Sequence, residues 1–117
     1  MMRKLTLLCI ASAIAATPLS LQAQDQLSEG KVLFEHWCAS CHGAGPGHPG
    51  TQALELRYQG SKPGPLEERD DLTPPFVGVF VRNGISVMPF FRKTEINDEE
   101  LAAIGAYLSQ SDSIVTE

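Results

Sequence analysis

The stretch Cys38-Ala39-Ser40-Cys41-His42 decides what this chain holds and therefore how it folds. Two thiols separated by two residues and followed at once by an imidazole form the attachment motif of a c-type haem. On a helical turn the two thiols reach the two vinyl groups of one porphyrin, while the histidine offers its ring to the iron. The motif predicts one covalently attached haem c per chain, bound through Cys38 and Cys41, with His42 as an iron ligand.

Three other interpretations of these residues are open to the sequence alone. A thioredoxin-like redox pair is disfavoured because no alternating strands and helices surround the motif. A zinc site would add His48 to the three ligand side chains of the motif, although zinc fingers space their second ligand pair much further away. A disulfide between Cys38 and Cys41 would close a very small loop and would leave His42 without a role.

The first residues of the chain predict its compartment. Arg3 and Lys4 form a positive start, and the apolar stretch over residues 5–16 is too short to span a bilayer comfortably. Ala23 supplies a small residue where a signal peptidase would cut. We therefore expect a secretory signal peptide over residues 1–23 and a periplasmic location in a bacterium.

Residues 24–117 then form one small cytochrome-sized domain with no membrane span. Loss of the two basic residues of the signal lowers the formal charge from −5 to −7, which disfavours nucleic acid or anionic lipid as a partner. Loss of Cys9 with the same segment leaves no thiol beyond the two of the motif. A domain of this size builds its core only marginally, and a buried porphyrin would supply much of it.

Apolar spacing and capping residues predict an all-α domain of three to four helices wrapped around the haem. Ser28 and Thr73 stand at N-cap positions, and Asn97 with Glu100 has the spacing of a capping box. Gly84 is placed to stop the helix that Thr73 begins. The expected helices are residues 29–40, 51–58, 74–83 and 97–108. The charged run at 67–71 is interpreted as a solvated loop.

Met88 is the expected second ligand of the iron, so that His42 and Met88 form the metal site. It is the single methionine outside the signal segment, and Pro89 stiffens the irregular stretch that carries it. His36 and His48 are rival ligands. His36 is expected to face solvent, and His48 lies too near His42 in sequence to reach the opposite face of a porphyrin.

Further contacts to the haem are predicted from the neighbouring residues. A ligating histidine donates its other N–H to a fixed acceptor, and the loop after the motif offers the carbonyls of Pro46 and Pro49, of which Pro49 is preferred. The side chains best suited to bind haem propionates are Trp37, Arg57, Tyr58 and Arg82.

These residues resemble class I cytochrome c over nearly all of residues 24–117. Gly30, Phe34 and the cysteine motif have the spacing of that family's N-terminal helix, and residues 101–108 with Tyr107 resemble its C-terminal helix. The resemblance implies that the two helices cross at Gly30, where only a hydrogen side chain lets the backbones approach.

A more particular resemblance lies in residues 81–84 followed by 88–91. They are similar to the small cytochrome subunits of periplasmic flavoprotein dehydrogenases of the p-cresol methylhydroxylase type. This implies a one-electron carrier, not itself an enzyme, between a dehydrogenase of phenolic or alcohol substrates and a downstream cytochrome or oxidase. The short loop after His42 and the long charged stretch 51–72 depart from the pattern. The alternatives are a haem-based sensor or small peroxidase with a displaceable sixth ligand, and an obligate subunit of a complex.

Overall fold

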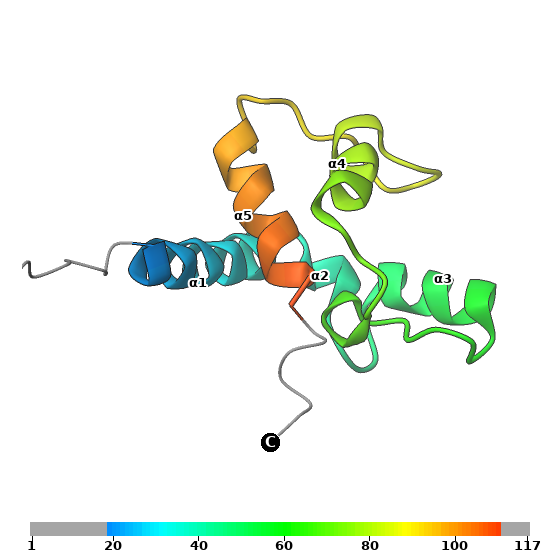
Figure 1. Ribbon diagram of the computed structural model, residues 1–117. Coiled ribbons are helices and arrows are strands. Elements are labelled where there is room, and N and C mark those ends of the chain that lie inside the picture. Colours follow the sequence, from blue (N-terminus) through cyan, green and yellow to red (C-terminus); the bar gives the residue numbers. More distant parts are fainter. Residues whose placement is uncertain (1–18, 111–117) are drawn as a thin grey trace, which may run out of the picture.

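The computed structural model describes residues 19–110, and every regular element within that range is helical (Figure 1). The expected all-α class is confirmed. The first expected helix divides at Cys38 into two, so the described range holds five α-helices and one 3₁₀ turn. The elements are α1 (Leu19–Trp37), α2 (Ala39–His42), α3 (Pro49–Tyr58), η1 (Leu66–Glu68), α4 (Pro74–Asn83) and α5 (Asp98–Leu108).

The start of α1 differs from the prediction. The helix begins at Leu19, and Ser28 lies inside it with its hydroxyl donating to the Asp25 carbonyl at 2.9 Å. The N-cap assignment of Ser28 is therefore wrong, because the preceding leucine, alanine and glutamine residues favour continuation of the helix. Residues 1–18 of the predicted signal peptide, with Cys9, lie outside the described residues, and residues 19–23 form the first turn of α1.

Helices α1 and α5 cross at Gly30, as expected (Figure 1). A Cβ atom added to Gly30 would lie 2.1 Å from the Ala103 carbonyl oxygen and 2.8 Å from Cβ of Tyr107. Phe34 and Ile104 are completely buried beside this crossing. The glycine is thus required by the close approach of the two backbones.

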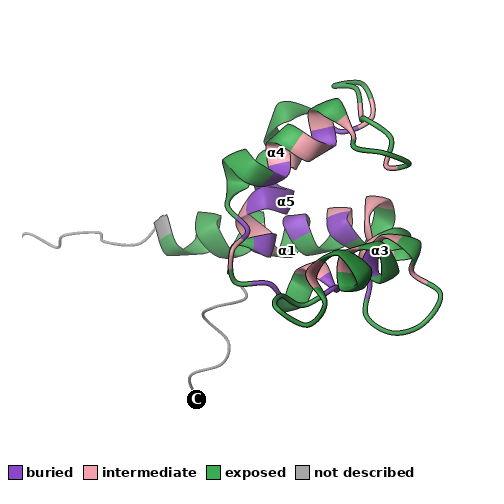
Figure 2. Ribbon diagram, turned by 90° about the vertical axis from the view of Figure 1, so that its right-hand side faces the viewer, coloured by how far each residue is buried: buried purple, intermediate pink, exposed green. Residues whose placement is uncertain are grey.

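Helix α4 packs against α5 with the predicted boundaries. Thr73 caps its start, accepting from the Phe76 amide at 3.4 Å, and Gly84 ends it with a φ of 66°, a left-handed conformation that favours glycine. Val77 and Val81 are buried on its inner face, and Gly105 of α5 lies against Pro74. Figure 2 shows the buried residues gathered where α1, α4 and α5 meet.

The capping box of α5 is also present. The Asn97 side chain accepts from the Glu99 and Glu100 amides, both at 2.9 Å, and the Glu100 carboxylate accepts from the Asn97 amide at 2.7 Å. These bonds satisfy the first donors of the helix and fix its start after the segment that carries Met88.

The charged run at 67–71 is solvated only in part, because Glu67, Glu68 and Asp70 are exposed whereas Arg69 is buried. Arg69 is only 2% exposed, and its guanidinium makes two hydrogen bonds of 2.7 Å to the Asp71 carboxylate. Glu67 accepts a hydrogen bond from the Tyr107 hydroxyl of α5. The run therefore includes a local ion pair between Arg69 and Asp71 and a hydrogen bond to α5 through Glu67. Only the second of these joins segments that are distant in sequence.

Within residues 19–110, no helix combines the length and the apolar character that a membrane crossing requires.

Candidate functional site

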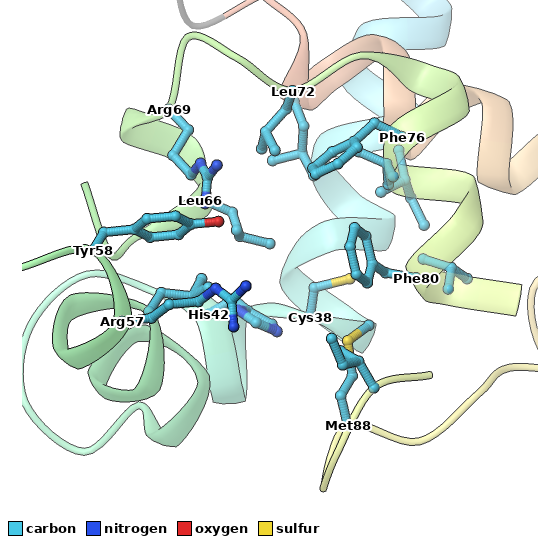
Figure 3. A pocket seen from close by; sticks show the side chains of 16 residues that line it. Cys38, His42, Arg57, Tyr58, Leu66, Arg69, Leu72, Phe76, Phe80 and Met88 are labelled. Carbon is cyan, nitrogen blue, oxygen red and sulfur yellow. The ribbon is translucent and has the colours of Figure 1, made fainter. Parts of the chain in front are cut away.

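A cavity of about 370 Å³ opens beside the helix crossing (Figure 3). Its volume is within the range of cofactor and ligand sites in proteins. The walls are largely apolar and come from α3, η1, α4, α5 and the segments between them. The chemically active side chains that line it are Cys38, His42, Arg57, Tyr58, Arg69 and Met88.

Cys38 lies at the junction of α1 and α2, and Cys41 lies within α2. The Cys38 carbonyl accepts from the Cys41 and His42 amides at 3.0 and 2.9 Å, which fixes the motif as a helical turn. Cys38 lines the cavity, and burial together with the nearby Cys41 thiol raises its pKa to about 11. Cys41 is exposed, and no disulfide joins the two cysteines. The motif therefore presents one cysteine at the cavity and one at the surface.

His42 lines the same cavity as a neutral imidazole. Burial lowers its pKa, which favours the uncharged form that binds a metal. Its Nδ1 atom is buried and has no hydrogen-bond partner, so the predicted bond to the Pro49 carbonyl is not present in the structure. Pro49 instead opens α3, and a Cβ on the adjacent Gly50 would lie 2.8 Å from Nδ1. The backbone of α3 thus closes on this edge of the ring.

Met88 reaches the cavity from the loop after α4 (Figure 3). Ile85 and Met88 exchange two backbone hydrogen bonds, of 3.2 and 2.9 Å, which close a tight turn around Ser86. Ser86 has a φ of 54°, in the left-handed region. The turn leaves the methionine half-buried and directs its side chain into the space that His42 also lines.

The rival histidines lie elsewhere. His36 is exposed and stands edge-on to the Trp37 ring, and Nδ1 of His48 lies 3.1 Å from the Ser40 carbonyl oxygen. Neither lines the cavity. Among the described residues, no three histidine, cysteine or acidic side chains are grouped to hold a metal ion, so the proposed zinc cluster does not form.

The polar end of the cavity contains two of the four side chains predicted there. Arg57 and Tyr58 line it. Trp37 packs on Phe91 with ring centres 5.8 Å apart, and Arg82 bonds to the chain around α5, so the placement of these two at the cavity is wrong.

Arg69 is the functional residue that the sequence analysis missed. Its guanidinium carbon lies 4.8 Å from the centre of the Tyr58 ring, and a hydrogen bond from Arg69 is the main cause that lowers the pKa of the Tyr58 phenol. Asp71, paired with Arg69 and Lys62, has a pKa below its usual range. The acidic residues next to Arg69 indicated a solvated loop, so the sequence did not predict that Arg69 lines the cavity.

The whole site suits an iron porphyrin. A neutral imidazole and a thioether enter an apolar cavity beside two thiols, and cationic side chains stand at one end for carboxylate groups. Buried polar atoms normally have a hydrogen-bond partner, whereas Nδ1 of His42 has none. This indicates that the His42 ring has a role beyond packing, such as binding a ligand.

Comparisons with known proteins agree with this chemistry. The family model described as "Cytochrome C oxidase, cbb3-type, subunit III" matches residues 25–108. The 4-cresol dehydrogenase (hydroxylating) cytochrome c subunit of Pseudomonas putida is 31% identical over 88 residues. That alignment covers 75% of this chain and 65% of the relative's length. No solved structure gives a significant match.

Proposed function

The chain belongs to the cytochrome c family, and from this premise we propose that it is a periplasmic one-electron carrier with one covalent haem held between His42 and Met88. The observation that carries the proposal is that Met88, from a segment far along the chain, meets Cys38 and His42 of the cysteine motif at one apolar cavity. When bound, the haem iron supplies the one-electron chemistry, and the chain itself transforms no organic substrate.

Each side chain of the motif has a separate task. Cys38 and Cys41 form the covalent links, and His42 binds the iron through the ring nitrogen opposite Nδ1. The Pro49 carbonyl is the proposed acceptor for Nδ1–H, because the Pro49–Gly50 backbone already lies against that edge of the ring. Such a bond would fix the tautomer and the plane of the imidazole.

Met88 supplies the second iron ligand. When haem is bound, this thioether would favour the reduced iron and raise its potential, and it would leave no iron position open to small molecules. Arg57, Tyr58 and Arg69 hold the carboxylate end of the porphyrin by charge-assisted hydrogen bonds. Of these, Arg69 is the best positioned, because its pairing with Asp71 and its contact with the Tyr58 ring already fix the guanidinium.

Replacement of Met88 tests this assignment. In Met88→Ala the haem should stay attached while the near-infrared band of the iron–thioether bond disappears and the potential falls by roughly 0.1 V or more. Val87→Ala is the matched control, since Val87 is 94% exposed and should leave both readings unchanged. Survival of the band in Met88→Ala would exclude this ligand. Carbon monoxide binding to the reduced parent protein would instead favour the sensor or peroxidase alternative.

The electron donor is proposed to be a dehydrogenase, a flavoprotein acting on phenolic or alcohol substrates, with a cytochrome or oxidase as acceptor. The relative named above is the cytochrome c subunit of a dehydrogenase, the 4-cresol dehydrogenase (hydroxylating). Around Met88 the side chains of Ile85, Val87 and Phe90 are 52%, 94% and 60% exposed, an apolar collar suited to brief docking.

A charge placed in this collar tests the docking face. Phe90→Asp should slow reduction by a candidate dehydrogenase strongly, because a carboxylate would be desolvated in the contact. Val32→Asp on α1 is the control, since Val32 is 64% exposed and lies outside the collar. Stopped-flow reduction of the two variants at two ionic strengths measures the difference. Equal rates for Phe90→Asp and the parent would move the docking site elsewhere.

A further inference from the structure

Arg82 ties the end of α4 to the two segments that follow it. One guanidinium nitrogen donates to the carbonyls of Phe91 and Ile96, at 3.1 and 2.8 Å, and another donates to the Asp98 carboxylate at 3.0 Å. The side chain is 22% exposed, so most of it is withdrawn from water. Hydrogen bonds from a charged donor are about twice as strong as neutral ones, and here two of them end on backbone.

The residues between Arg82 and Phe91 form the loop that carries Met88. At its base the Phe91 amide donates to the Val81 carbonyl at 2.8 Å, next to the bond from Arg82 to the Phe91 carbonyl. Both backbone groups of Phe91 are therefore held by consecutive residues of α4. A Cβ on Gly84 would lie 2.6 Å from the Met88 carbonyl oxygen, so the loop folds back on the helix end.

The outer part of the loop has little burial to hold it. Ile85, Val87 and Phe90 are all more than half exposed, whereas Phe91 at the base is half-buried and packs on Trp37. The orientation of Met88 is thus determined by the turn at 85–88 and by the base of the loop. Of the side chains that bond to the base, Arg82 is the one that reaches both Phe91 and Ile96.

We infer that Arg82 is a positioning residue for Met88: its guanidinium clamps the base of the loop and thereby keeps the thioether at the cavity. The inference rests on the proposed role of Met88 as an iron ligand. Some residues orient a metal ligand without touching the metal themselves. Mutation of such a residue commonly lowers metal affinity about tenfold or more.

Asp98 and Lys93 are the charged residues beside the Arg82 guanidinium. Asp98 also binds the Lys93 ammonium at 2.5 Å, so the carboxylate keeps a partner when Arg82 is replaced. Lys93→Gln removes that ion pair and leaves every bond of Arg82 in place. It is the matched control for the loss of a positive charge near Asp98.

Displacement of Met88 by imidazole, in oxidised holoprotein under fully folding conditions, tests the clamp. Arg82→Gln should bind imidazole roughly tenfold tighter than the parent and show a weaker near-infrared iron–thioether band. Arg82→Lys, which keeps the charge but has a single nitrogen for three acceptors, should fall between the two. Lys93→Gln should match the parent. Denaturant midpoints of all four proteins separate a clamp from a general loss of stability.

Each outcome either supports or overturns the proposed role of Arg82. Parent-like imidazole affinity and band in Arg82→Gln would overturn the clamp while Met88 ligation stands. If Arg82→Gln does not fold, Arg82→Lys decides alone, and a parent-like result there overturns the inference. Equal tightening in Lys93→Gln would assign the effect to charge and also overturn it. Absence of the band from the parent would refute Met88 ligation itself, and the clamp with it.

Discussion

The crossing of α1 with α5 is closely packed, whereas the cavity beside it is open. At the crossing the two backbones touch, and a Cβ on Gly30 would lie 2.1 Å from a carbonyl oxygen of α5. In the cavity, by contrast, apolar side chains of α4 such as Phe76 and Phe80 face about 370 Å³ of space. The crossing is filled by protein atoms alone, whereas the cavity leaves space for a bound group. The two regions should therefore respond differently to mutation.

The largest effect is expected at the crossing. Gly30→Leu should destabilise the fold by about 2 kcal/mol or more, because the side chain would overlap the α5 backbone. Gly78→Ala on α4 is the control. A Cβ there meets nothing closer than Leu101 at 3.9 Å, so helix propensity should stabilise the protein by up to about 1 kcal/mol. Denaturant unfolding followed at the haem band measures both, and an unchanged midpoint for Gly30→Leu would contradict the crossing.

On the cavity side, Gly50→Ala should disturb the site more than the fold. The added methyl would lie 2.6 Å from Cε1 of His42, so the imidazole or the start of α3 must move. We expect about 1 to 2 kcal/mol of destabilisation together with a shift of the haem absorption bands. Gly78→Ala again serves as the control. A parent-like spectrum would mean that α3 does not hold the ring.

An effect of similar size, but dependent on pH, is expected from the ion pair in the cavity wall. Arg69 and Lys62 lower the pKa of Asp71, so the pair stabilises the fold above the ordinary aspartate pKa of about 4 and this stabilisation is lost as the pH falls below it. Asp71→Asn should cost about 1 to 2 kcal/mol at pH 7 and progressively less toward pH 2. Asp70→Asn, at an exposed neighbour, is the control. A cost that does not vary with pH would refute the linkage.

The smallest effect concerns the tie between the two regions. The Tyr107 hydroxyl, at the crossing, donates to Glu67 of η1, next to Leu66 of the cavity wall, and burial together with this carboxylate raises the Tyr107 pKa. Tyr107→Phe should cost about 0.5 to 1 kcal/mol. A double-mutant cycle with Glu67→Ala, which removes the acceptor, isolates the bond, and strictly additive costs would show that the two regions are not coupled there.

The parts of the fold that the sequence predicted are those governed by local chemistry. Thr73, Gly84 and the Asn97–Glu100 box act on backbone groups within a few residues, so their roles can be deduced from spacing. The start of α1 was misplaced because a serine that can cap a helix can also lie inside one, with its hydroxyl bonded to the preceding turn.

The residues of the site divide in the same way. The cysteine motif and Met88 are recognisable as chemistry, and the structure brings Cys38, His42 and Met88 to one cavity. Arg69, expected in a solvated loop, lines the cavity, whereas Arg82, expected at the haem propionates, bonds to the chain around α5. The local sequence does not distinguish the two arginines, because burial of Arg69 and the partners of Arg82 depend on tertiary packing.

The most direct test of the account is mass spectrometry of the purified holoprotein after acid–acetone treatment. We expect the mass of the chain from residue 24 onward plus one haem, with the haem mass lost when Cys38 and Cys41 are both replaced by alanine. A haem that extracts into the organic phase, leaving the unmodified polypeptide, would contradict covalent attachment at this motif.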